Sequence, residues 1–80
     1  MVFVYVIRSL SSGRLYVGQA VNVEQRLKDH NSGKSKYTSA FLPWKVIYTE
    51  EFFDRKTARI REKYLKSTAG KNFLRRNGIS

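Results

Sequence analysis

Two short segments near the start of the chain, separated by a turn, constrain its fold more than any other feature. Residues 3–8 read Phe-Val-Tyr-Val-Ile-Arg and residues 14–19 read Arg-Leu-Tyr-Val-Gly-Gln, so both are rich in the β-branched and aromatic residues that strands favour. Between them, Ser-Leu-Ser-Ser-Gly has the composition of a turn. The pattern predicts an antiparallel hairpin, in which a turn centred on residues 10 and 11 would place Tyr5 opposite Tyr16 on one face.

A third strand is predicted after Pro43, over residues 44–49. Alternation predicts that one of its faces carries Trp44, Val46 and Tyr48, and that the other carries Lys45, Ile47 and Thr49.

Three segments have helical signals. Asn22, followed three residues later by Gln25, has the spacing of a capping box, and the helix that begins there should end by residues 31–33, which close with Gly33. A second helix is predicted from Asp54 to about Lys66, with an apolar arc of Ala58, Ile60, Tyr64 and Leu65. Residues 68–76 could form a short third helix. The expected fold is α/β, of the α+β type: a small three-stranded antiparallel sheet flanked by two or three helices.

Length and charge narrow the function. Eighty residues support a single domain, residues 1–80, and without cysteine the chain has neither disulfides nor thiolate metal ligands, so the cytoplasm is the expected compartment. The longest apolar run near the N-terminus is too short to span a membrane, and no membrane partner is expected. Residues 1–52 have seven basic and four acidic side chains, a charge of +3, and residues 53–80 have nine basic and two acidic ones, a charge of +7. Together they give the net charge of +10. Such a field favours a nucleic-acid partner.

Five side chains could take part in catalysis or in metal binding. The two tyrosines have both a structural and a functional interpretation, because aromatic rings also suit a half-buried strand. On the first helix, Arg26 and His30 are four residues apart and point the same way, and His30 is the only histidine. On the second helix, Glu62 is the only carboxylate after Asp54, and it is either a partner for Arg59 or Lys66 or a ligand for Mg²⁺.

Taken in order, these pieces resemble the GIY-YIG nuclease family. Its two tripeptides correspond to Phe3-Val4-Tyr5 and Tyr16-Val17-Gly18, followed by Arg26, by the stretch from His30 to Lys34, and by Glu62. The chain is most similar to the small branch related to the N-terminal nuclease domain of the bacterial excision-repair incision subunit. It departs from the family at Phe3, where the first tripeptide has glycine.

The resemblance implies a Mg²⁺- or Mn²⁺-dependent DNA endonuclease, structure-selective and linked to DNA repair or recombination within a larger complex. It implies Tyr5, Tyr16, Arg26, His30 and Glu62 as catalytic residues that converge on one hollow around the phosphate and the metal. Glu62 would hold the metal, and Tyr5, ahead of His30, would act as the base. The expected DNA contacts are Gly18, Lys34, Lys36, Tyr37, Arg59, Lys63, Lys66 and Lys71.

Two other hypotheses fit the charge equally well. The chain could be a basic nucleic-acid-binding module that keeps the scaffold without turnover, or a structural component of a ribonucleoprotein or repair assembly. The sequence favours the enzyme, because a pure binder has no use for Glu62. Within residues 34–44, the aromatic side chains of Tyr37, Phe41 and Trp44 are either stacking platforms for unpaired bases or anchors of the core and loops.

Overall fold

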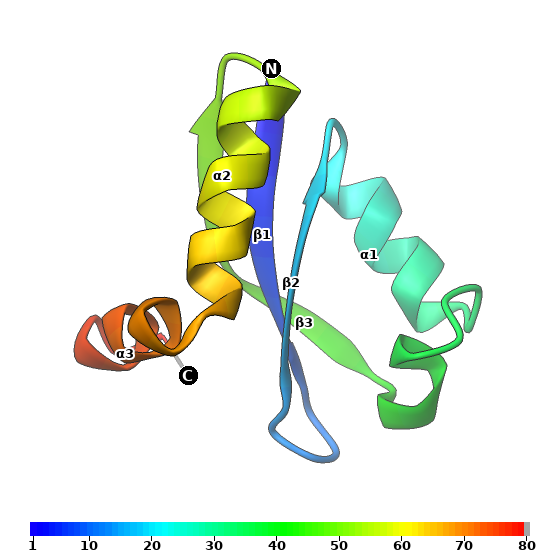
Figure 1. Cartoon of the computed structure of the whole chain (residues 1–80). Helices are drawn as coiled ribbons and strands as arrows, with labels where there is room; N and C mark the ends of the chain where they lie inside the picture. Colours follow the sequence, from blue (N-terminus) through cyan, green and yellow to red (C-terminus); the bar gives the residue numbers. More distant parts are fainter. Residues whose placement is uncertain (80) are drawn as a thin grey trace.

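A computed structural model describes residues 1–79 as a three-stranded antiparallel sheet with helices on both faces (Figure 1). The central strand β1 pairs with β2 on one side and β3 on the other. This is the predicted fold class. The elements are β1 (Val2–Ser9), β2 (Leu15–Ala20), α1 (Val23–Asn31), the 3₁₀ helix η1 (Thr38–Phe41), β3 (Trp44–Phe52), α2 (Arg55–Lys66) and α3 (Thr68–Arg76).

The hairpin forms with a register two residues away from the predicted one. Tyr5 lies opposite Gly18, and Tyr16 lies opposite Ile7. The prediction that the two tyrosines are direct partners is therefore wrong, because the turn spans residues 10–13 and closes on Gly13, whose φ is +79°. Since side chains alternate with a period of two, a two-residue shift leaves both tyrosines on the same face, with ring centroids 6.5 Å apart.

The two faces of the sheet have different partners. Valines of β1 and β2 pack on one face against Ala58 and Leu65 of α2 and Leu74 of α3, which forms the main apolar core. The other face, which carries Tyr5, faces α1 and η1. Figure 1 shows β2 as the outer strand, with α2 on one side of it and α1 on the other. The outer edge of β2 is consequently flanked by helices from both layers.

An irregularity in β3 overturns its predicted face assignment. Val6 pairs with Tyr48 and Ile7 pairs with Val46, so Ile47 is an extra residue in β3. Val46 stays with Trp44 on the α1 face, whereas Tyr48 joins the apolar core on the α2 face. The prediction that these three share a face is wrong because alternation holds only within an uninterrupted ladder.

The predicted helix caps are present. The side chains of Asn22 and Asp54 accept hydrogen bonds from the backbone N–H groups of Gln25 and Thr57. At Gly70, a Cβ atom would lie 2.0 Å from the carbonyl oxygen of Tyr64, which explains a glycine inside α3. None of the described helices is long and apolar enough to cross a membrane.

The side of α2 that faces the sheet differs from the predicted apolar arc. Ile60 is 66% exposed, so its assignment to that arc is wrong. Two charged residues, Arg61 and Glu62, fall instead between the buried Ala58 and Leu65. Each is paired with the sheet: the Arg61 guanidinium donates two hydrogen bonds to Glu50 of β3, and Glu62 accepts one from Gln19 of β2. Partnered charges can occupy positions that the hydropathy pattern assigns to apolar residues.

Candidate active site

A buried hydrogen-bonded chain joins the hairpin to α1. The hydroxyl oxygen of Tyr5 lies 2.9 Å from Nε2 of His30, and Nδ1 of His30 lies 2.9 Å from Oγ1 of Thr38. All three side chains are fully buried. With its proton on Nδ1, the imidazole donates to Thr38 and accepts the Tyr5 hydroxyl proton at Nε2.

Tyr16 completes an aromatic cluster around this chain. Its ring meets that of His30 edge-on, with centroids 5.0 Å apart, and it lies 6.0 Å from the ring of Tyr37. Tyr16 is only partly buried. It therefore connects the buried Tyr5–His30 pair with the molecular surface.

The electrostatics of the pair keep both side chains neutral. Burial, with a contribution from Tyr16, raises the pKa of Tyr5 to about 12, although Arg26 partly offsets the rise. Burial, followed by the charge of Arg26, lowers the pKa of His30, so its imidazole is neutral at pH 7 and free to accept a proton. With both groups neutral, the Tyr5 hydroxyl donates its hydrogen bond to Nε2 of His30.

Gly18 makes room for the Tyr5 hydroxyl. A Cβ atom built on Gly18 would lie 2.6 Å from that oxygen and 2.8 Å from the Cζ of Tyr5, too close for any side chain. Tyr5 thus lies directly over the backbone of the edge strand. The sequence interpretation made Gly18 a DNA contact, but on this face it is covered by Tyr5.

Arg26 lies at the border of the same cluster. Its side chain is 41% exposed, and its ion pair with Asp29 is long at 3.8 Å. It is close enough to Tyr5 to lower that residue's pKa through its charge and a side-chain hydrogen bond. A guanidinium so placed can reach both the reacting hydroxyl and a phosphate at the surface.

Glu62 approaches from the other side of the edge strand. Gln19, next to Gly18, points to the α2 face and donates its amide N–H to Glu62 Oε1 at 3.0 Å, while Lys66 binds Oε2 at 2.8 Å. The structure therefore gathers Tyr5, Tyr16, Arg26 and His30 on one face and holds Glu62 on the opposite one, so the expectation that all five share one hollow is wrong: α2, which carries Glu62, packs on the other face of the sheet. The charge of Glu62 still reaches around the strand, since it contributes to the raised pKa of Tyr5.

The oxygen atoms beside Glu62 suit a hard cation. Among residues 1–79 no cluster of three or more histidine, cysteine or acidic side chains is placed for a metal. However, Oε1 of Gln19 is buried without a hydrogen-bond partner within that range, and it lies in the amide group that touches Glu62. Mg²⁺ needs only one or two protein oxygens besides water and phosphate, and Glu62 and Gln19 supply oxygens of that kind, although Gln19 and Lys66 already bond both Glu62 oxygens in this arrangement.

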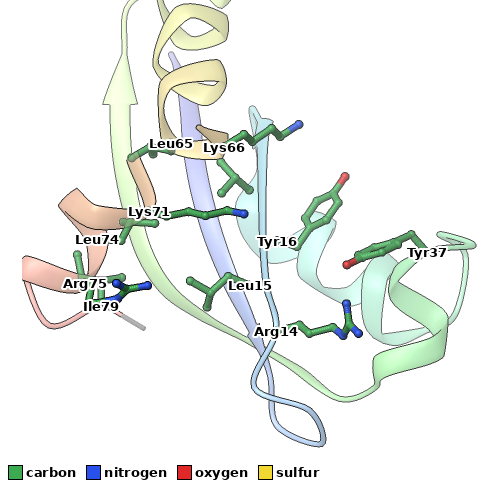
Figure 2. Close-up of a pocket in the computed structure, with 11 residues that line it drawn as sticks. Arg14, Leu15, Tyr16, Tyr37, Leu65, Lys66, Lys71, Leu74, Arg75 and Ile79 are labelled. Atoms are coloured by element: carbon green, nitrogen blue, oxygen red, sulfur yellow. The ribbon is translucent and has the colours of Figure 1, made fainter. Parts of the chain in front are cut away.

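The predicted DNA contacts fall into two groups. Tyr37, Lys66 and Lys71 line one groove together with Tyr16, as Figure 2 shows. The others, Lys34, Lys36, Arg59 and Lys63, are exposed outside it, and Lys34 pairs with Asp29 at 3.4 Å. Trp44 is buried and donates its indole N–H to the carbonyl of Thr38, so it anchors the η1 segment, in keeping with the structural interpretation, and is not a surface for stacking bases.

Sequence reasoning missed Thr38 and Gln19 in the site. Thr38 belongs to a segment without a hydropathy pattern, so no signal pointed to it. Gln19 had a signal: it is the polar residue after Gly18 in an alternating strand, so its side chain must point to the face opposite that of Tyr16.

Comparisons with known proteins agree with this arrangement. Residues 1–77 match the family model described as the GIY-YIG catalytic domain. A UPF0213 protein of Bacillus licheniformis is 45% identical over 85% of this chain and 71% of its own length. A UPF0213 protein of Natronomonas pharaonis is 38% identical over 81% of this chain and 76% of its own length. The solution NMR structure of a UPF0213 protein from Bacillus halodurans superposes with a TM-score of 0.54 at 32% identity, covering 92% of this chain and 82% of that one.

Proposed function

Because the chain belongs to the GIY-YIG catalytic-domain family, we propose that it is a Mg²⁺- or Mn²⁺-dependent endonuclease that hydrolyses phosphodiester bonds in DNA. The observation that carries the proposal is the 2.9 Å contact between the hydroxyl of Tyr5 and Nε2 of a buried, neutral His30. A module that only binds DNA has no need of a proton acceptor at this position. The proposal extends to a single-domain cytoplasmic protein that acts on branched or flapped DNA in repair or recombination, within a larger complex.

The proton transfer uses Tyr5 and His30 as one unit. Water attacks phosphorus and gives its proton to the Tyr5 oxygen, while the Tyr5 hydroxyl proton passes to Nε2 of His30. The Tyr5 hydroxyl already occupies Nε2 of His30, so His30 accepts the proton through Tyr5. Thr38 accepts from Nδ1–H and keeps Nε2 available. The P–O bond to the leaving alkoxide breaks, and that oxygen takes a proton from solvent.

The negative charge of the phosphate is stabilised from both faces of β2. Arg26 binds non-bridging oxygens from the α1 face, where its guanidinium stays charged as negative charge develops. Glu62 and the Gln19 amide oxygen would hold the divalent ion on the α2 face. When bound, the ion supplies electrostatic stabilisation of the leaving oxygen. The scissile phosphate accordingly lies at the outer edge of β2, near Gly18.

A cleavage assay separates this function from the two binding-only hypotheses. Purified protein is incubated with forked, flapped and fully paired DNA in Mg²⁺ and then in excess chelator. We expect cleavage of the branched substrates that stops with chelator. Binding without cleavage in Mg²⁺ or Mn²⁺ would contradict the proposal.

A further inference from the structure

A groove runs along the outer edge of β2 beside the candidate active site. Its volume is about 490 Å³, within the range of ligand-binding clefts. One wall comes from α3 and the end of α2, and the other carries Tyr16 and Tyr37 (Figure 2). The groove thus borders the same strand that carries Gly18 and Gln19.

The floor of the groove is apolar. Leu15 of β2 and Ile79 present partly exposed side chains there, above the buried Leu65 and Leu74. A floor of this kind does not favour a hydrated anion, but it matches the flat face of a nucleobase.

The rim of the groove is cationic. Figure 2 shows Lys71 and Arg75 extending from α3 toward β2, and Arg14 on the Tyr37 side. Lys66 lies at the end nearest Glu62, to which it is bound. None of the described residues that line the groove is acidic. Cations around an apolar floor complement the phosphates that flank a single base.

The groove is continuous with the reacting groups at two points. Tyr16 lines it and also packs edge-on against His30, and Lys66 lines it and also binds Glu62. A DNA strand whose scissile phosphate lies at Gly18 would therefore place an adjacent nucleotide in the groove. In a duplex both faces of that base are stacked on its neighbours, so only an unpaired nucleotide can lay a face on the floor.

We propose that the groove between β2 and α3 seats one unpaired nucleotide of a DNA strand next to the scissile phosphate, with its base on Leu15 and Ile79 and its phosphates on Lys71, Arg75 and Arg14. The inference rests on the proposed function for the position of the cleaved bond. It makes the groove the source of selectivity for flaps and single strands over paired DNA.

Removing one base at a time from a flapped DNA, in the presence of chelator, tests the proposed nucleotide site without cleavage. The dissociation constant is measured by fluorescence anisotropy for a flapped DNA in which one unpaired nucleotide at a time lacks its base but keeps its phosphates. We expect one position next to the junction at which base removal weakens binding about fivefold or more, as loss of a stacked base does. Equal affinity at every position, or an RNA flap that binds at least as tightly as DNA, would overturn the proposal.

A charge-matched pair of variants locates the effect. The first double variant combines Lys71→Ala with Arg75→Ala, both in the groove. The control combines Lys45→Ala with Lys56→Ala, which removes the same charge from residues that do not line the groove. The first pair should lower the preference for flapped over paired DNA by about fivefold or more, whereas the second should weaken both substrates alike. The same loss of preference in both pairs would refute the location.

The outcomes separate this inference from the proposed function. A base-dependent position without Mg²⁺-dependent cleavage would leave the seat in place and reject the nuclease. Cleavage of flapped DNA without any base-dependent position would keep the nuclease and reject the seat.

Discussion

Replacing Gly18 with alanine tests whether the glycine exists to admit Tyr5. The new Cβ would lie 2.6 Å from the Tyr5 oxygen, where ordinary contact begins near 3.4 Å, so the two atoms must separate by 3.4 − 2.6 = 0.8 Å. Tyr5 is 1% exposed and is held by His30, so its ring has no free space to enter. Overpacking of this kind costs about 1–3 kcal/mol of unfolding free energy.

The same displacement should slow catalysis. Moving the Tyr5 oxygen by several tenths of an ångström stretches its 2.9 Å contact with His30, and misplacement approaching 1 Å can cost about 100-fold in rate. We expect the Gly18→Ala variant to melt lower by about 4–8 °C for each kcal/mol lost, measured by circular dichroism, and to cleave flapped DNA about 100-fold more slowly.

A double-mutant cycle shows whether the cost comes from this contact. In a Tyr5→Leu background both of the close atoms, the hydroxyl oxygen and Cζ, are absent, so Gly18→Ala should lose at least about 0.5 kcal/mol less stability there than in the wild type. Equal costs in the two backgrounds, or an unchanged melting temperature in the single variant, would refute the explanation of Gly18.

Three further changes test the electrostatics and the packing. Since burial lowers the pKa of His30, the unfolded chain binds more protons below its ordinary pKa of 6.5, so unfolding free energy should fall as the pH drops from 7 through the lowered value. His30→Gln should remove that part of the slope in urea titrations, and identical slopes would count against a buried neutral imidazole. Glu50→Gln should cost about 2 kcal/mol, because Arg61 loses its charged partner on β3; a urea midpoint equal to that of the wild type would contradict this role. Gly70→Ala should cost about 3 kcal/mol or more, since the backbone oxygen of Tyr64 cannot move aside, and a melting temperature within 2–3 °C of the wild type would be inconsistent with the close approach.

The sequence was most informative where local rules act alone. The caps at Asn22 and Asp54 and the extent of α3 depend on short-range chemistry, and the structure confirms them. The predictions of the hairpin register and of the faces of β3 were wrong. The turn has four residues and β3 has one extra residue at Ile47, and both features are set by pairing with β1. Strand alternation predicts the face of a residue only as far as its ladder is unbroken.

The candidate site was predicted in part. Tyr5, Tyr16, Arg26 and His30 come together as the hairpin and the first helix suggested. Glu62 was expected to join them in one hollow, and this was wrong, because its face depends on how α2 packs across the sheet. The hydropathy pattern placed Ile60 in the core and gave no account of Arg61, whereas the ion pair with Glu50 on β3 brings Arg61 to the sheet.

The central claim is that Tyr5 and Glu62 act on one phosphodiester from opposite sides of β2. The most direct test compares single-turnover cleavage of flapped DNA in Mg²⁺ by the wild type, Tyr5→Phe, Glu62→Gln and the double variant, with Glu51→Gln as an exposed control. We predict that each of the first two variants slows cleavage by at least about 100-fold and that the double variant is no slower than the slower of the two. Cleavage by Glu62→Gln at the rate of the Glu51→Gln control, or effects that multiply in the double variant, would contradict the claim.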